Sequence, residues 1–230
     1  MKPYYEHAGI IIYHGDCRDV MPTVTCDALI TDPPYGINLK TDSSRFSGGS
    51  PENHRETQAR RNRARGSARV HKPARPIVGD REPFDPSPML ACGQEQIIWG
   101  WNHFADRLPR GACLVWLKRT DAAFQSFLSD AEVAWFSRGH GVYCRRDLTN
   151  YTIHNERVHP TQKPLTLMSW CLSFIPKARH ILDPYMGSGT TLVAAKNLGL
   201  RATGIEIEER YCEFAAKRLS QEVLLFGVQP

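Results

Sequence analysis

The stretch HILDPYMGSGTTLVAAKNLGLRATGIEIEERY, at residues 180–211, constrains the fold of this chain more than any other feature. It begins with a short apolar run, passes through a glycine-rich turn, continues with helical periodicity and ends in a second apolar run. A strand, a tight turn, a helix and a second strand in this order predict two parallel strands joined by a helix. Glu206 ends the second run, 17 residues beyond Gly189. A Rossmann-type acid that binds ribose hydroxyls lies at about this distance.

The same alternation runs through most of the chain. Apolar runs predict strands at 9–14, 26–31, 95–99, 112–117, 132–136, 180–183 and 201–207. Helical periodicity predicts helices at 121–128, 164–175, 190–198 and 208–220. We therefore expect an α/β fold with a doubly wound, mostly parallel sheet covered by helices on both faces. A chain of 230 residues suits a single domain of this kind.

Composition excludes several classes of protein. Hydrophobic residues make up 41% and charged residues 23%, as in soluble globular proteins. The chain has no apolar run that could span a membrane and no signal peptide, so we expect a cytoplasmic protein without a membrane partner. The seven cysteines are scattered singly, which favours free thiols in a reducing compartment. Neither cysteines nor histidines show metal-ligand spacing, so no metal is expected.

Residues 41–83 interrupt the alternation with a stretch rich in Ser, Gly, Pro and Arg. Between residues 41 and 82 the chain has nine Arg, one Lys and five acidic residues. This excess of five positive charges equals the net charge of +5 of the whole chain. This composition predicts a basic, partly disordered insertion loop within one domain spanning 1–230. The loop either binds DNA phosphates or is a solvated tail. If it binds DNA, the expected contacts are Arg60, Arg61, Arg63 and Arg65.

The glycine-rich turn has the features of a ligand-binding loop. Gly187 and Gly189 allow the backbone to approach a ligand closely, and Thr190 opens a helix whose free N–H groups face that ligand. The turn lacks both the P-loop lysine and the third glycine of the dinucleotide fingerprint, so a nucleoside without a pyrophosphate is favoured. The alternative is a tight structural turn, with Glu206 a solvated acid at the start of a helix.

A second strand ends in the turn LITDPPYGINL, at residues 29–39. Because prolines have no N–H group, this turn offers mainly acceptors, the Asp32 carboxylate and the Pro33 carbonyl. An exocyclic NH₂ group has two donors that match them, and Tyr35 adds a ring on which a base could stack. If the strands ending at Asp32 and Asp183 are neighbours, both turns open on one crevice. The alternative is a rigid turn with Asp32 as a helix cap.

This arrangement of acceptors suits methylation of an amine. The exocyclic amine of adenine or cytosine is a poor nucleophile because its lone pair is delocalised into the ring. Two acceptors that bind its hydrogens favour a tetrahedral nitrogen, and Asp32 would stabilise the positive charge that develops as the new bond forms. The matching electrophile is the methyl group of a sulfonium, because its neutral thioether leaves without a general acid.

With these motifs in this order, the chain resembles the permuted β-class of DNA amino-methyltransferases. The resemblance covers about residues 9–40 and 92–220 and rests on D-P-P-Y at 32–35, H-P-T-Q-K-P at 159–164 and D-P-Y-M-G-S-G-T-T at 183–191. It implies a Rossmann-like class I methyltransferase fold, S-adenosylmethionine as cofactor, DNA as substrate and a role in restriction-modification; a homodimer is one possible assembly. Site-specific methylation of adenine N6 is favoured over cytosine N4, because the family tends to place Asp first for adenine and Ser first for cytosine.

The resemblance also assigns site residues by position. The catalytic residues are Asp32, Pro33, Pro34 and Tyr35. The residues that would bind the cofactor are Asp16, Cys17, Thr161, Lys163, Asp183, Tyr185, Gly187, Ser188, Gly189, Thr190 and Glu206. Among these, Asp16 and Cys17 resemble the piece that contacts the adenine of the cofactor, and Lys163 would meet its carboxylate.

Residues 119–158 form the variable region, which has room for a reduced target-recognition element at most. Within it, SRGHGVYCRR at 137–146 predicts a hairpin whose basic residues contact bases. The expected contacts are Arg138, Arg145 and Arg146.

Other functions stay open at this level. A C5-cytosine methyltransferase would need a thiolate beside the base-binding turn, and the chain has no Pro-Cys dipeptide. A catalytically silent DNA-binding protein could keep the same fold. Methylation of RNA or of a protein amide, and a nicotinamide dehydrogenase, are more distant alternatives.

Overall fold

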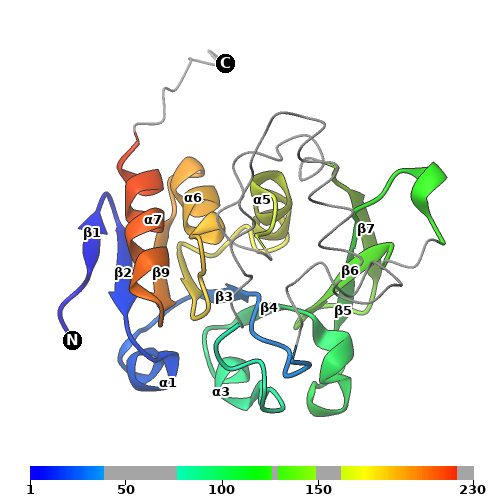
Figure 1. Cartoon of the computed structure of the whole chain (residues 1–230), viewed down its shortest axis with the longest axis horizontal. Coiled ribbons are helices and arrows are strands. Elements are labelled where there is room, and N and C mark those ends of the chain that lie inside the picture. Colours follow the sequence, from blue (N-terminus) through cyan, green and yellow to red (C-terminus); the bar gives the residue numbers. More distant parts are fainter. Residues whose placement is uncertain (39–76, 126–128, 149–161, 222–230) are drawn as a thin grey trace, which may run out of the picture. The chain divides into compact units, whose positions relative to one another are not determined.

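The computed structural model describes residues 1–38, 77–125, 129–148 and 162–221 (Figure 1). The chain divides into two compact units. The larger consists of Met1–Pro33 together with the chain from Asp85 onward, and the smaller is Pro34–Phe84.

Within the described residues of the larger unit, nine strands form one sheet in the order β1-β2-β9-β8-β3-β4-β6-β5-β7. Five of the eight pairings are parallel, so the prediction of a mostly parallel sheet is confirmed. The strands are β1 (Tyr5–His7), β2 (Ile10–His14), β3 (Ala28–Thr31), β4 (Glu95–Trp99), β5 (Ala112–Leu117), β6 (Ala131–Phe136), β7 (Val142–Arg146), β8 (His180–Asp183) and β9 (Arg201–Glu206). Strands β1 and β7 were not predicted from the sequence.

Figure 1 shows the three longest described helices, α7, α6 and α5, side by side on one face of the sheet, with α1 and α3 on the other side. The helices predicted at 164–175, 190–198 and 208–220 are confirmed. The described helical elements are α1 (Cys17–Val20), η1 (Met21–Thr23), α3 (Ser87–Leu90), η3 (Trp101–His103), η4 (Ala105–Arg107), η5 (Asp121–Ala123), α5 (Leu165–Ser173), α6 (Thr190–Asn197) and α7 (Glu209–Ser220).

The prediction of an α-helix at 121–128 is wrong for residues 121–125, the described part of that range. Only the short 3₁₀ turn η5 forms there, and Gln125 then adopts a φ of 60°, which a right-handed helix does not allow. Residues 126–128 lie outside the described part of the chain.

The middle of the sheet is buried on both faces, as is usual for parallel strands covered by helices. All four residues of β3 are buried, and Ile97, Leu114 and Ile181 extend the same core. Strand β8 pairs with β3 on the side away from β4, with Leu29 opposite Leu182. The strands that end at Asp32 and Asp183 are therefore neighbours, which is the condition for their turns to share one edge of the sheet.

The predicted hairpin at 137–146 is wrong. Strand β5 lies between β6 and β7 and pairs with β7 in parallel, from Cys113 opposite Val142 to Leu117 opposite Arg146. The link over residues 137–141 crosses the start of β5, where Cys113 N donates to Gly141 O at 2.9 Å. The described part of the variable region thus supplies two strands of the central sheet.

In the smaller unit, Asp80 joins the two ends of the insertion. Its carboxylate accepts from the backbone of Gly36 at 2.9 Å, and its carbonyl accepts from the backbone of Asn38 at 2.7 Å. A Cβ at Gly36 would lie 2.4 Å from the carbonyl oxygen of Glu82, so glycine is required. The insertion is therefore closed at its base, while residues 39–76 lie outside the described part. No described helix has the length and apolar character needed to cross a membrane.

Candidate active site

Three carboxylates lie at one edge of the sheet because each marks the carboxyl end of a parallel strand. Asp32 follows β3, Asp183 ends β8 and Glu206 ends β9. In open α/β sheets this edge, next to a reversal of strand order, is where ligands bind.

Asp183 is buried beneath this edge, with an exposed fraction of 3%. It accepts hydrogen bonds from the Thr31 hydroxyl at 2.8 Å and from the backbone N–H of Tyr185 at 3.2 Å. Burial raises the pKa of Asp183 to about 6, although hydrogen bonds from Thr191, Thr31 and Tyr185 oppose the shift. Its carboxyl group therefore titrates closer to neutral pH than an exposed aspartate.

The glycine turn adopts the left-handed backbone conformation that the sequence suggests. Gly187 has a φ of 50° and Gly189, the N-cap of α6, a φ of 75°. A Cβ at Gly189 would lie 2.8 Å from the Cβ of Ala215 in α7. Both the backbone conformation and the packing of α6 against α7 thus require glycine there.

Arg218 supports this turn and was missed by the sequence analysis. Its guanidinium donates to the carbonyl of Ser188 at 2.6 Å and to the hydroxyl of Thr190 at 3.3 Å. Ser188 and Thr190 are themselves buried. In the sequence Arg218 looks like one more charged residue on an amphipathic helix, so no local signal distinguishes it.

Glu206 is oriented by the glycine turn and by the start of the next helix. Its carboxylate accepts from Gly187 N at 3.0 Å and from Glu208 N at 2.8 Å. Burial raises the pKa of Glu206, and the two backbone hydrogen bonds partly offset that effect. Its carbonyl accepts from Gly15 N at 2.9 Å, which brings the turn after β2 to the same place.

The predicted adenine-contacting pair lies beside this turn. Asp16 caps α1 by accepting from the backbone N–H of Arg18 at 2.9 Å, and it also pairs with the Arg18 guanidinium. Cys17 is buried and hydrogen-bonded to the side chain of Tyr185, and burial raises the pKa of both groups. The structure therefore brings Cys17 and Tyr185 together, while the Asp16 carboxylate already serves as a helix cap.

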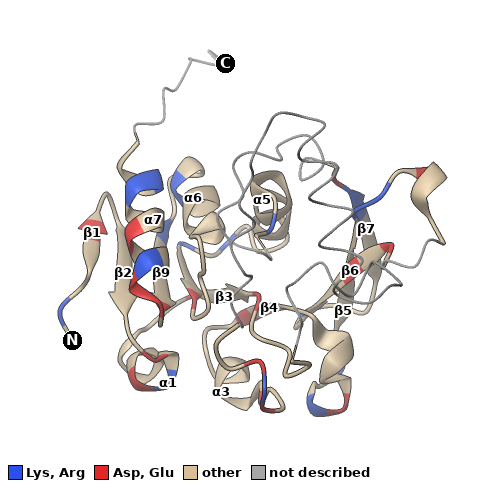
Figure 2. Cartoon of the chain, in the orientation of Figure 1, with Lys and Arg blue, Asp and Glu red and all other residues tan. Residues whose placement is uncertain are grey.

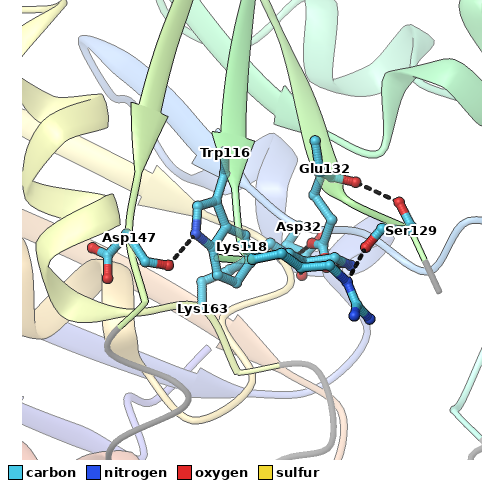
Figure 3. A network of polar contacts seen from close by, with 9 residues as sticks. Asp32, Trp116, Lys118, Ser129, Glu132, Asp147 and Lys163 are labelled. Carbon is cyan, nitrogen blue, oxygen red and sulfur yellow. Dashed lines mark hydrogen bonds and ion pairs between the residues drawn. The ribbon is translucent and has the colours of Figure 1, made fainter. Parts of the chain in front are cut away.

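Asp32 begins a row of alternating charges (Figure 3). The Lys163 ammonium pairs with Asp32 and, at 3.1 Å, with Glu132 of β6; the second oxygen of Glu132 accepts from Lys118 at 2.9 Å. Lys163 is only 6% exposed, and its Nζ lies 5.6 Å from the centre of the Trp99 ring. Burial by itself would raise the pKa of Glu132. The positive charges of Lys163 and Lys118 have the larger effect and lower that pKa to about 2. Four charged groups thus neutralise one another next to the predicted catalytic turn.

Glu132 and Lys118 were not singled out from the sequence. The available signal was an acid inside the apolar strand pattern EVAWF. The contact of Lys163 with a cofactor carboxylate stays a prediction; the partners described here are Asp32 and Glu132.

The three arginines assigned to base contacts do not form one patch. Arg138 lies 3.6 Å from Glu95 at the start of β4, the end of the sheet away from Asp32. Arg145 and Arg146 end β7, beside Trp116 and Leu117 of β5, and Figure 2 shows basic residues at this end of β7.

Several of the predicted site residues lie outside the described part of the larger unit. Pro34 and Tyr35 belong to the smaller unit. Thr161 and the four arginines of the insertion, Arg60, Arg61, Arg63 and Arg65, lie outside the described residues. Their roles stay predictions.

The sheet order and the turns at its carboxyl edge define the Rossmann-like fold of class I methyltransferases. Two solved structures share this fold. The M1.HpyAVI–SAM complex is 22% identical, with a TM-score of 0.51 over 91% of this chain and 99% of that chain. The cytosine-N4-specific PvuII DNA methyltransferase is 15% identical, with a TM-score of 0.53 over 97% and 90%.

Sequence comparisons find similar proteins among the DNA methyltransferases. Residues 110–218 match the N6/N4 methyltransferase family, described as DNA methylase. The type II methyltransferase M2.DpnII of Streptococcus pneumoniae is 49% identical over 65 residues, which are 28% of this chain and 24% of that protein. M.ScaI of Streptomyces caespitosus is 26% identical over 96% of this chain and 84% of its own length. The family match over residues 110–218, the relatives and the shared fold all support a similarity of this chain to the amino-methyltransferases of the N6/N4 family.

Proposed function

We propose that this protein transfers the methyl group of S-adenosylmethionine to an exocyclic amine of a base in DNA, with adenine N6 as the target. The observation that carries the proposal is the position of Asp32 at the end of β3, next to β8 and its glycine turn. The choice of adenine rests on Asp in the first position of D-P-P-Y. Cytosine N4 is the alternative, and the PvuII enzyme with a similar fold has that specificity.

The residues at the edge of the sheet fit the proposed cofactor. Glu206 presents a carboxylate held by Gly187 and Glu208, and ribose hydroxyls are natural donors to it. Gly187 and Gly189 let the backbone approach the ligand closely, and Cys17 would border its adenine. When bound, S-adenosylmethionine supplies a methyl group on a sulfonium and leaves as a neutral thioether.

Asp32 would act on the target amine. Its carboxylate accepts a hydrogen bond from the NH₂ group and stabilises the positive charge on that nitrogen as the N–C bond forms and the S–C bond breaks. The surplus proton of the methylated amine then leaves to solvent. The Pro33 carbonyl is proposed as the second acceptor, and the Tyr35 ring as the surface on which the flipped base stacks.

The biological setting follows from the same proposal. The relatives named above are type II methyltransferases, so a role in restriction-modification, in the cytoplasm and on DNA, is the setting we propose. No observation favours a catalytically silent DNA-binding protein, because the D-P-P-Y turn and the glycine turn are both intact.

The reaction can be tested with unmethylated DNA and S-adenosylmethionine labelled in its methyl group. After digestion to nucleosides, we expect the label in N6-methyldeoxyadenosine. Label in N4-methyldeoxycytidine would establish the alternative target, and unlabelled nucleosides would overturn the proposal.

The role of Asp32 can be tested with Asp32→Asn, which keeps the size of the side chain and removes its charge. We expect methyl transfer to fall by about 100-fold or more while the affinity for S-adenosylmethionine, measured by calorimetry, is unchanged. Asp27→Asn is the control, since Asp27 precedes the same strand and its carboxylate accepts structural hydrogen bonds from the backbone of Arg179 and His180. Equal loss of binding and transfer in Asp32→Asn would instead indicate a structural cap.

A further inference from the structure

We propose that Glu132 is a positioning residue for the methyl transfer, which holds Lys163 and sets the net charge around Asp32. The inference rests on the proposed function, because it assumes that Asp32 acts on the target amine. Glu132 lies outside the family motifs, and no role for it was predicted from the sequence.

Glu132 pairs with the same Lys163 ammonium that pairs with Asp32. Lys163 lies two residues before α5, and its ammonium is buried between the carboxylates of Asp32 and Glu132. A buried ammonium is strongly destabilising unless it is paired, so these carboxylates define where it lies. Lys118 in turn binds the other oxygen of Glu132.

Charge balance is the reason why Glu132 matters for the reaction. The transfer moves positive charge onto the target nitrogen beside Asp32, and a nearby ammonium opposes that movement. Lys163 alone would cancel the charge of Asp32. Because Glu132 offsets Lys163, more of the negative field of Asp32 acts on the developing cation than Lys163 alone would leave.

The other charged and titratable groups around this row are few within the described residues. Asp183 of β8 interacts electrostatically with Asp32, and Lys118 follows β5. The Cys171 thiol of α5 interacts electrostatically with Lys163 and with Arg145 of β7; burial raises the pKa of that thiol to about 12, so it stays neutral. Arg145 in turn lies 3.9 Å from the buried carboxylate of Asp147. The Trp99 ring, itself fully buried, separates part of Lys163 from water. Besides Asp32, Glu132 is thus the acid whose negative charge offsets the positive charge of Lys163 among the described contacts.

Glu132→Gln tests the proposal, because it keeps the volume and an acceptor oxygen but removes the charge. We expect kcat to fall about tenfold, with KM for DNA and for S-adenosylmethionine within twofold of the parent. The acid limb of the kcat profile should move to lower pH, because removal of a neighbouring negative charge makes Asp32 harder to protonate. A lower kcat with an unmoved acid limb would overturn the proposal, since a purely structural defect reduces the active fraction equally at every pH.

Two further variants sharpen the test. Glu132→Asp restores the charge and should recover most of the rate and the position of the acid limb. Lys118→Gln removes a positive charge from the other end of the row and should move the acid limb the opposite way, to higher pH; this variant keeps the test decisive if Glu132→Gln does not fold. Glu95→Gln is the matched control, because Glu95 lies at the opposite end of β4 and pairs with Arg138; its profile should match the parent.

The two proposals fail in different ways. If Asp32→Asn retains full activity, or DNA is not methylated, the proposed function fails. If Asp32→Asn is inactive and both Glu132→Gln and Lys118→Gln leave the acid limb unmoved, only the role of Glu132 fails.

Discussion

The Thr31 hydroxyl donates a 2.8 Å hydrogen bond to the Asp183 carboxylate, joining the last residue of β3 to the last residue of β8. Both side chains are buried, so water does not compete for this bond. The bond lies one residue before Asp32 and four before Gly187. It therefore ties the turn proposed to act on the base to the turn proposed to hold the cofactor.

The elevated pKa of Asp183 predicts a pH-dependent stability. Because its pKa rises from an ordinary value near 4 to about 6 in the folded protein, the folded state holds this proton more tightly than the unfolded state. The resulting stabilisation is complete below about pH 4 and lost as the pH rises through 6. Relative to Asp183→Asn, we expect the parent to lose about 3 kcal/mol of unfolding free energy between these limits, measured by urea unfolding. Parallel curves for the two proteins would contradict this.

Glu206→Gln should weaken the binding of S-adenosylmethionine about tenfold, because hydrogen bonds from ribose hydroxyls to a charged acceptor are stronger than those to an amide. The rate at saturating cofactor should change little. Isothermal calorimetry gives the dissociation constant. Glu208→Gln is the control, since Glu208 lies nearby and pairs with Arg210 at 2.7 Å. If both variants bind with the parent's affinity, Glu206 is not the ribose partner.

Gly189→Ala should destabilise the protein more than Gly199→Ala. Both glycines have a positive φ, 75° and 68°, so each substitution costs about 1 kcal/mol for backbone strain. Only at Gly189 does the new methyl group meet the Cβ of Ala215, at 2.8 Å, which adds about 1–3 kcal/mol of overpacking. Urea unfolding of the two variants gives the difference directly, and equal losses would show that α7 adjusts at no cost.

Replacing Arg60, Arg61, Arg63 and Arg65 together with Ala should weaken DNA binding across all sequences. The slope of log K against log salt should flatten by roughly 0.9 for each lost phosphate contact. Preference among sites should persist, because phosphate contacts position the protein and base contacts specify the sequence. Fluorescence anisotropy over a salt series measures both.

The arginines of the sheet provide the comparison for that experiment. Arg145 and Arg146 end β7 at the edge that carries Asp32, whereas Arg138 lies at the other end of the sheet. Arg138→Ala should therefore bind DNA like the parent. A parental salt slope in the fourfold variant would assign the phosphate contacts to Arg145 and Arg146 instead.

The sequence alone determined most of the strands and helices and the chemistry of the two turns. These features depend on neighbouring residues: alternation along a strand, the missing N–H groups of Pro33 and Pro34, and the freedom of Gly187 and Gly189 to adopt a positive φ. Because these effects act between residues that are close in the chain, they can be predicted from the sequence alone.

Tertiary structure alone decided which strands pair and which charges meet. The insertion of β5 between β6 and β7 overturned the expected hairpin, because a link as short as 137–141 can either fold a strand back on its neighbour or cross the end of another strand. Lys163 meets Asp32 across 131 positions of sequence and meets Glu132 from a different strand. The tertiary fold brings these groups to one buried place, and the low dielectric there strengthens the attraction between opposite charges. Neither effect is encoded in local spacing.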